Sequence, residues 1–548
     1  MRNKLVDKKP YLLLNAFLAK KEHASLNIAD FLKDNAQVNA YELDSQHELE
    51  GKLFVKVPEA KKPKWSGFTE KLTGVSIDEL GNQSSSAVLI IKTNDYTMAF
   101  TFGYGRFLID TKYFIQDFGI KTALNTLNHD SLRSVDLYTL EDQAVQKKSQ
   151  ASRESGVGIF GIDISKDVLR AVTGSPKAGV DLKNISGGDS VFSFGIEINV
   201  DEISDLVSVL AGYYNNDSYK DGFSWVDNIR RVKENSEIDK LNDKLVDALK
   251  NDQSKISITI PEIIQWDTIW GFSFTRNKSS INPTIEEKHY FNHLDLISLS
   301  IESIKRDRLF VYDTYENENE YNMYKCMYFE FKESDKTYIL FSGFWYEIDN
   351  SFMSRIDSSL EQIELSTLPF PKVYAWDEIE DGKTKSKIET EGDYNERAAN
   401  DHGYYLLDKK LIKSDRTTTA IELCDLMTED KQFIHVKHRK GGSAGLSHLF
   451  AQGSVSAEVL LGDRNFRKVT RKVLKKVKVG LQDSVSIDGF KSDGVEVVFL
   501  ILGEDSISLK ENLPFFSKVN LTKTHENLTQ RGFSVSVAGV EKEERPSA

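Results

Sequence analysis

The stretch Thr418–Lys437, TTAIELCDLMTEDKQFIHVK, predicts two short apolar strands joined by a polar turn. The first strand carries Glu422 and Asp425, and the second ends with His435 and Lys437. Carboxylates on one strand beside a lysine on the next can hold a divalent cation against a phosphodiester and place an ammonium group beside the attacking water. This pattern predicts a phosphodiester-cleaving site, and no other part of the sequence carries a pattern of comparable specificity.

The elements on either side of this stretch predict a small α/β domain. Helical turns precede it and two helices follow it, so the chain alternates between helical and strand periodicity. The expected order is a helix at 394–400, strands at 404–407, 420–426 and 432–438, helices at 446–461 and 464–478, and a strand at 497–502.

The whole chain predicts an α/β fold class with more than one domain, because 548 residues are too many for one hydrophobic core. We expect residues 1–375 to form a mixed α+β region, with two subdomains as one option and a role in sensing or partner binding. The charged segment 376–393 indicates a linker or a long loop. Residues 394–540 form the predicted α/β domain, and 541–548 a disordered tail.

Composition excludes several classes of protein. Residues 11–19 are apolar, but a membrane-spanning helix needs roughly 20 such residues, so we expect no membrane association. The two cysteines, Cys326 and Cys424, suit a reducing cytoplasm and exclude a zinc site built from several cysteines. The net charge of −13 argues against a protein that coats nucleic acid over its whole surface.

Positive charge is concentrated in one segment. Residues 464–478 hold eight basic residues and no acidic one, so the rest of the chain has a net charge of −13 − 8 = −21. The segment predicts an amphipathic helix whose basic face contacts nucleic-acid phosphates, with a solvated helix face as the alternative. Its predicted phosphate contacts are Arg464, Lys468, Arg471, Lys475 and Lys478. Arg439 and Lys440 follow the second strand, beside a predicted helix start that suits a backbone phosphate.

The segments TAIELCDL (419–426) and FIHVKHRKGGSAGLSHLFAQGSVSAEVL (433–460) resemble the C-terminal block of a poorly characterised family of bacterial proteins of about this length. The family is sporadically distributed, and its genomic neighbourhood is associated with antiviral defence. Further similarity lies at 169–177, 224–234 and 324–349, so the resemblance covers most of the chain. The C-terminal block is similar to the PD-(D/E)xK restriction-endonuclease-like superfamily.

This resemblance implies a metal-dependent endonuclease, a hydrolase that uses Mg²⁺ or Mn²⁺. It makes Glu422 the acid of the first strand. His435 then stands at the motif's second acid position, and Lys437 at its lysine position. Glu396 would match an acid on the preceding helix, and Gln452 a glutamine on the following helix. The predicted catalytic residues are thus Glu422, His435, Lys437, Glu396 and Gln452, and the predicted metal ligands are Glu422, His435 and Asp425.

The departures from the superfamily pattern leave alternatives open. A histidine stands where an acid is expected, and a neutral imidazole suits magnesium less well than a carboxylate. His435 is compatible with a nuclease that depends on manganese. It is also compatible with a nucleic-acid-binding or sensor protein that has lost catalysis. Arg397 and His402 also match the R-x4-H spacing of helical ribonucleases, as a minor alternative. DNA is the expected substrate, although the sequence does not distinguish it from RNA, and a homo-oligomer or a defence-system partner stays open.

Overall fold

The computed structural model describes residues 9–63, 65–81, 83–140, 145–261, 269–276, 281–313, 318–380, 383–414, 420–439 and 444–546. The chain forms two compact units, one of residues 1–139 with 146–226 and one of residues 140–145 with 227–548. Helices and sheets are mixed in both units, which confirms the predicted α/β class. The division after residue 226 falls inside region 1–375, for which two subdomains were one option.

Unit 1 is built on a ten-stranded sheet with the order β2-β3-β4-β5-β1-β10-β9-β8-β6-β7. The apolar segment near the N-terminus forms β1, which pairs antiparallel with β5 and β10 in the middle of this sheet. The apolar character of this segment is therefore that of a central strand. Among the described residues, no helix is both long enough and apolar enough to cross a membrane. The strands are β1 Tyr11–Leu18, β2 Asn39–Glu42, β3 Glu50–Lys56, β4 Ser86–Lys92, β5 Thr97–Gly103, β6 Leu127–Thr139, β7 Val145–Ser155, β8 Asp167–Pro176, β9 Lys183–Gly188 and β10 Val191–Glu197.

Helices α2 (Phe118–Thr126) and α3 (Ile203–Asn215) contribute to the main core of unit 1. Phe118 of α2 packs edge-to-face on Phe192 of β10, with ring centroids 6.4 Å apart. Helix α2 thereby lies against the half of the sheet that contains β8, β9 and β10.

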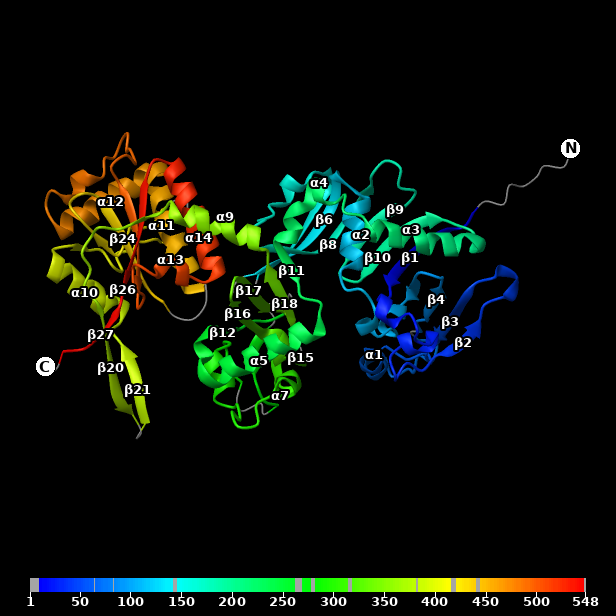
Figure 1. Ribbon diagram of the computed structural model, residues 1–548. Coiled ribbons are helices and arrows are strands. Elements are labelled where there is room, and N and C mark those ends of the chain that lie inside the picture. The colour runs from blue at the N-terminus through cyan, green and yellow to red at the C-terminus, as the bar shows by residue number, and fades with distance from the viewer. Residues whose placement is uncertain are drawn as a thin grey trace. The chain divides into compact units, whose positions relative to one another are not determined.

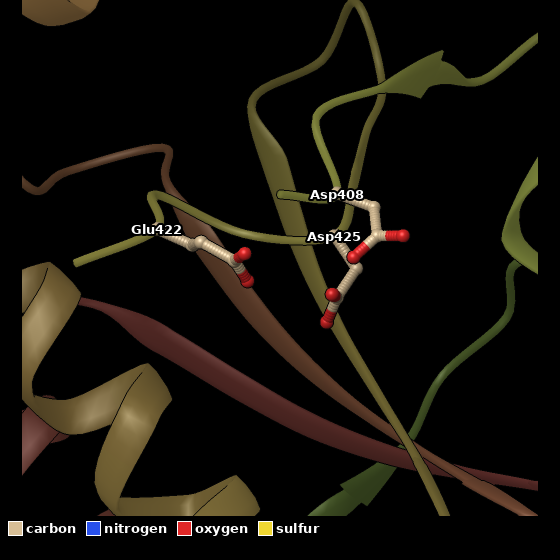
Figure 2. Close-up of side chains that lie close together, drawn as sticks. All are labelled: Asp408, Glu422 and Asp425. Atoms are coloured by element: carbon tan, nitrogen blue, oxygen red, sulfur yellow. The ribbon is translucent and has the colours of Figure 1, made fainter. Parts of the chain in front are cut away.

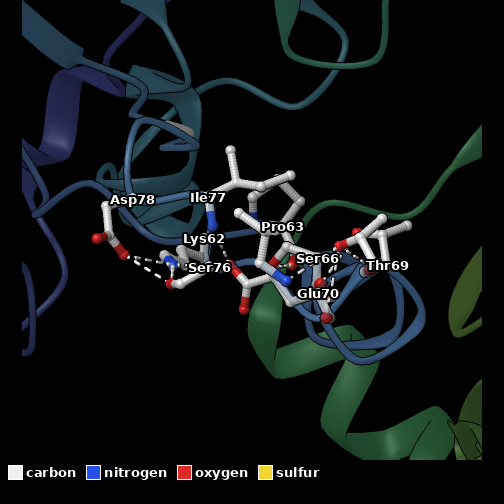
Figure 3. A network of polar contacts seen from close by, with 10 residues as sticks. Lys62, Pro63, Ser66, Thr69, Glu70, Ser76, Ile77 and Asp78 are labelled. Carbon is white, nitrogen blue, oxygen red and sulfur yellow. Dashed lines mark hydrogen bonds and ion pairs between the residues drawn. The ribbon is translucent and has the colours of Figure 1, made fainter.

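A polar network holds the short helix α1 (Ser66–Thr73) to the loop that follows it (Figure 3). The Lys62 ammonium donates hydrogen bonds to the carboxylates of Glu70, at 2.9 Å, and Asp78, at 3.2 Å. Glu70 also accepts the backbone N–H of Ile77 at 2.9 Å. One lysine therefore closes the segment 62–78 on itself at the surface of unit 1.

The first part of unit 2 is an antiparallel sheet with the order β11-β18-β17-β16-β12, covered by the long helix α5 (Asn235–Asn251). Asn242 of α5 accepts hydrogen bonds from Trp345 Nε1, at 3.0 Å, and from the Tyr324 hydroxyl, at 2.8 Å. These two bonds tie α5 to strand β18 and to helix α8 through groups that are all buried. The elements are β11 Ile229–Arg231, β12 Ile256–Ile258, β13 Ile269–Ser273, α7 Ile301–Arg306, β14 Arg308–Asp313, β15 Glu318–Asn322, α8 Met323–Cys326, β16 Met327–Glu333, β17 Lys336–Phe341, β18 Phe344–Ile348 and α9 Asn350–Glu361.

The C-terminal part of unit 2 contains a six-stranded sheet with the order β19-β26-β25-β24-β23-β22 (Figure 1). Strands β22, β23 and β24 form an antiparallel meander, and β24, β25 and β26 run parallel. The strands are β19 Glu364–Leu365, β22 Tyr405–Leu406, β23 Leu426–Met427, β24 Gln432–His438, β25 Glu496–Leu502 and β26 Ser534–Val540.

Helices cover both faces of this sheet. Helix α10 (Glu391–His402) contributes Tyr394 and Ala398 to a core that includes Val436 of β24. Residues alternate between the faces of a strand, so His435 lies on the opposite face, where α11 (Ala444–Gly462) packs. The remaining helices are α12 Arg464–Val477, α13 Leu509–Asn512 and α14 Phe515–Gln530. This order of helix, strands, helices and strand is the one that the sequence predicted.

Three predicted segments differ in the structure. The strand expected at 420–426 is reduced to β23, because Ile421 pairs with Ile412 instead of continuing the ladder with β24. The charged segment expected as a linker forms the hairpin β20 (Val373–Glu380) and β21 (Lys383–Ile388), in which Lys387 pairs with Glu378 at 2.7 Å. Cross-strand pairs of opposite charge contribute to the stability of this hairpin. The expected tail adds β27 (Lys542–Glu544), parallel to β20.

Close contact between α11 and the sheet depends on a glycine. A Cβ atom on Gly453 would lie 2.5 Å from Cε1 of Phe499, a ring on β25 that is fully buried. The absence of a side chain at residue 453 therefore sets the distance between helix and sheet.

We expect Gly453→Ala to lower the free energy of unfolding by about 1–3 kcal/mol, because the added methyl group overpacks this contact. Urea denaturation measures the change. Gly445→Ala in the same helix is the matched control, since no described atom outside the helix's own backbone lies within 4 Å of the added Cβ. The control should be neutral or stabilising by up to about 1 kcal/mol through helix propensity. Equal effects of the two substitutions would contradict the packing argument.

Candidate functional site

Three carboxylates gather beside the meander of unit 2 (Figure 2). One carboxylate oxygen from each of Asp408, Glu422 and Asp425 lies within 4.8 Å of the others. Asp408 follows β22, Asp425 directly precedes β23, and Glu422 lies in the loop before it. Figure 2 shows the three side chains directed toward a common space, and all three are partly buried. We call this group the carboxylate cluster.

The backbone around Asp425 fixes the positions of two of these acids. The Asp425 carbonyl accepts the N–H groups of Leu407, at 2.8 Å, and Asp408, at 3.0 Å. Its own N–H donates to Ile434 of β24 at 2.9 Å, and its carboxylate accepts the N–H of Val436 at 2.8 Å. Asp408 and Asp425 are therefore held together by main-chain hydrogen bonds and not by the chance approach of flexible side chains.

The acids of the cluster repel one another when they are ionised. Burial raises the pKa of Asp425 to about 7, with further contributions from the charges of Glu422 and Asp408, and the Val436 hydrogen bond only partly opposes this. Burial and then the charge of Asp408 also raise the pKa of Glu422. A divalent cation would relieve this repulsion, and carboxylate oxygens are the ligands that Mg²⁺ and Mn²⁺ prefer.

Lys437 lies at the end of β24, where its ammonium group contacts Glu391 Oε2 at 2.8 Å. Glu391 Oε1 accepts the backbone N–H of His438 at 3.1 Å. Burial opposes ionisation of Glu391, but the hydrogen bonds from Lys437 and His438 outweigh it and leave the pKa of the carboxyl below its usual value. Lys437 directly follows Val436, whose N–H the Asp425 carboxylate accepts, so the ion pair borders the carboxylate cluster.

The structure brings together only part of the predicted metal-ligand set. Glu422 and Asp425 are in the carboxylate cluster, whereas His435 is not, and Asp408 is the third member. His435 is 2% exposed, packs on Phe499 and approaches Ser456 Oγ at 3.5 Å. Burial lowers the pKa of His435 to about 4, so the ring is neutral near pH 7.

A cavity of about 340 Å³ opens next to the cluster and shares Glu422 with it. The predicted residue Gln452 lies on its wall, and so does the buried ring of His435. The other lining residues are Leu411, Ala420, Ile421, His448, Ala451 and Val455.

The acid expected on the helix before the strands stands at a different position. Glu396 is exposed on α10, and Glu391 in the first turn contacts Lys437 instead. Five residues along an α-helix correspond to a rotation of about 140°, so the two glutamates cannot serve the same site. The sequence signal for Glu391 was an N-cap. The Thr390 side chain accepts the N–H of Asp393, so the helix starts earlier than predicted and includes Glu391.

Two more sequence observations are changed by the structure. Asp408 was missed, although an acid directly after a short strand is a recognisable signal. The alternative based on R-x4-H loses support, because Arg397 donates to Glu389 at 2.6 Å and to the Lys372 carbonyl at 2.7 Å. The Arg397 guanidinium is thus committed to holding α10 against β20.

The basic helix forms as predicted, as α12, but several of its charges are already paired. Arg464 contacts Asp488 at 2.5 Å, and Lys478 contacts Glu429 at 2.5 Å. Arg471 donates to the carbonyls of Gln482, at 2.6 Å, and Val485, at 2.8 Å, and to Asp483 at 3.1 Å.

Four exposed lysines are left for contact with a ligand. Within the described part of the chain they make no hydrogen bond or ion pair, although the charge of Lys468 lowers the pKa of Asp488. They are Lys468, Lys472, Lys475 and Lys476.

The basic end of β24 is also partly used by the fold. Arg439 pairs with Glu504 and donates to the Asn512 carbonyl at 2.6 Å. These contacts make Arg439 a structural residue, and burial lowers the pKa of its guanidinium. Lys440 lies outside the described residues.

We predict that acid destabilises the protein through His435. The unfolded ring binds a proton below about pH 6.5, whereas the folded ring binds one only near pH 4, so the free energy of unfolding should fall as the pH drops through that interval. The full loss is about 3 kcal/mol. Asp425, whose folded pKa is raised, contributes in the opposite direction below pH 7. The measurement is therefore the difference between wild type and His435→Leu in urea denaturation at several pH values, and a difference that does not change with pH would contradict the prediction.

Comparison with known proteins gives one match. A family model described as a family of unknown function (DUF6119) matches residues 14–541. No curated protein and no solved structure matches the chain significantly. The family match spans nearly the whole chain, which agrees with the expectation of an uncharacterised family of this length. The protein therefore belongs to the family of unknown function DUF6119.

Proposed function

We propose that this protein is a metal-dependent nuclease that cleaves phosphodiester bonds in nucleic acid, with its catalytic centre in the C-terminal part of unit 2. The observation that carries the proposal is the carboxylate cluster of Asp408, Glu422 and Asp425 beside the Lys437–Glu391 pair. Carboxylates that can hold a divalent cation, together with a lysine that can act on the phosphate or on the attacking water, are the groups that metal-dependent phosphodiester cleavage uses.

The donor set fits a hard divalent cation. Its ligands are carboxylate oxygens from Asp408, Glu422 and Asp425, which suit Mg²⁺ or Mn²⁺ better than a softer metal. When bound, such an ion supplies charge neutralisation and a water molecule of lowered pKa. The Asp425 carboxylate accepts a hydrogen bond from the Val436 N–H, which fixes its position without the ion.

Lys437 supplies the positive charge of the site. Its ammonium group is fixed by Glu391 at the end of β24, so it can orient a nucleophilic water molecule or stabilise the negative charge that develops on the phosphate. Because Glu391 is itself fixed by the His438 N–H, the position of the ammonium group depends on the backbone of β24 and the start of α10.

The alternative, a binding protein that has lost catalysis, rested on His435 in place of an acid. The third carboxylate at Asp408 supports the catalytic proposal, since the cluster has three acids without residue 435. We propose DNA as the substrate. An association with antiviral defence is proposed from the resemblance alone.

We expect Lys437→Met to lower cleavage of plasmid or oligonucleotide substrates, with Mg²⁺ or Mn²⁺, by about 10²–10³-fold, because a fixed charge at the reacting phosphate is lost. The matched control is Lys336→Met, which removes a lysine from a different ion pair, the one with Glu347 at 3.0 Å. Cleavage that survives in Lys437→Met would remove the site from consideration. Loss of cleavage in both variants would point to instability, which circular dichroism would reveal.

A second pair of variants tests the structural assignment of the helix acid. Glu391→Gln should reduce cleavage, whereas Glu396→Gln in the same helix should not, because only Glu391 contacts Lys437. In parallel, Mn²⁺ should raise the Tm of the wild type, and Asp425→Asn should abolish this rise. Binding of nucleic acid without cleavage under every metal would favour the alternative function.

We predict that phosphate contact by α12 depends on its exposed lysines. Lys468→Gln combined with Lys475→Gln should weaken duplex binding for all sequences and make the dependence of log affinity on log salt shallower by about 2 units. The control combines Lys33→Gln with Lys71→Gln, two exposed lysines of unit 1 with the same change in charge. An unchanged salt dependence would show that the helix is a solvated surface.

A further inference from the structure

The cavity next to the carboxylate cluster has a chemical character that metal-dependent cleavage does not explain. Leu411, Ile421 and Val455 give it apolar walls, and Leu411 and Val455 remain 64% and 38% exposed. Apolar side chains that stay in contact with water directly beside a charged cluster contribute nothing to binding a cation. They indicate a ligand that covers them.

Polar groups stand among these apolar walls. Gln452 and His448 come from α11, one turn apart, and both can donate and accept hydrogen bonds. The neutral His435 ring forms another part of the wall. A flat ligand with apolar faces and a polar edge matches this combination.

The volume also limits the ligand. About 340 Å³ lies at the small end of the range of roughly 300–1,000 Å³ that is usual for small-molecule sites. The cavity suits one ring system of moderate size and not a folded segment of polypeptide. Because Glu422 belongs both to the cavity and to the carboxylate cluster, the ligand would lie beside the reacting phosphate.

We propose that this cavity receives the base of an unpaired nucleotide next to the scissile phosphate, so that the substrate is single-stranded nucleic acid. This inference rests on the proposed nuclease function and names its substrate class. Proteins recognise unstacked bases by stacking side-chain rings, including that of histidine, on the faces of the base and by forming hydrogen bonds to its edges. In a duplex the same base would first have to leave its stack and its partner.

The test compares single-stranded and duplex oligonucleotides of one sequence with Mn²⁺. The wild type should cleave the single strand at least about tenfold faster, in kcat/KM, because unstacking is avoided. Val455→Phe, which narrows the cavity, should remove about tenfold from kcat/KM on the single strand. It should leave the Mn²⁺-induced rise in Tm unchanged, since Val455 is outside the carboxylate cluster.

Val209→Phe is the matched control, a valine on helix α3 of unit 1 that is 46% exposed and far from any proposed site in sequence. Gln452→Ala provides a second variant, which should alter the preference among the four bases without filling the cavity. An oligonucleotide with an abasic sugar at the cleaved position should be cut by wild type and by Val455→Phe at similar rates. If Val455→Phe slows the intact and the abasic strand equally, the base is not in the cavity.

Failure of this inference can be separated from failure of the nuclease proposal. Metal-dependent cleavage that favours duplex and is unaffected by Val455→Phe would overturn the cavity assignment and leave the nuclease intact. Calorimetry of nucleoside 5′-monophosphates with Mn²⁺ provides the other comparison, using the wild type, Lys437→Met and Val455→Phe. Binding to the first two proteins but not to Val455→Phe supports the cavity assignment even when no substrate is cleaved.

Discussion

Four hydrogen bonds converge on Asp425, and the candidate site depends on them. Its backbone joins the end of β22 to β24, and its carboxylate accepts the Val436 N–H in the strand that carries Lys437. One residue thus fixes the spacing between an acid that follows β22 and a lysine at the end of β24. A carboxylate placed by main-chain hydrogen bonds loses little conformational freedom when a ligand binds, which is the condition for a pre-organised site.

The same arrangement has an energetic cost that the fold accepts. Burial and neighbouring acids raise the pKa of Asp425 and Glu422, so the ionised cluster is less stable than separate solvated acids would be. Lys437 offsets little of this, because its closest contact is Glu391. Groups held at unfavourable charge in a partly buried position are typical of functional sites, since a purely structural role would select neutral side chains there.

The sequence predicted those parts of the fold that follow from local pattern. Strand β24 has the predicted bounds because Phe433, Ile434 and Val436 follow a polar turn, and α12 starts at Arg464 because Asp463 caps it. The loop that carries Glu422 was wrongly predicted as a strand. Ile421 in this loop pairs with Ile412, and the sequence pattern does not show which segment a residue will pair with. Asp408 follows a predicted strand, but the pattern does not identify Asp425 as the residue that it joins. The chemical roles of all these residues stay predictions.

Helix α12 shows why a run of charge is not by itself a binding surface. Its arginines have structural partners, whereas four of its lysines face solvent. This difference is expected, because a planar guanidinium can bind several acceptors at once and an ammonium group stays hydrated. Arg467 is buried and donates to the carbonyls of Leu460 and Leu461, at 2.7 and 2.8 Å, where α11 ends and its last carbonyls lack helical partners. Since α11 carries Gln452 and Val455, the basic helix also holds in place the wall of the cavity beside the carboxylate cluster. Part of the positive charge in this segment therefore shapes the site, and only the lysines are left to attract a polyanion toward it.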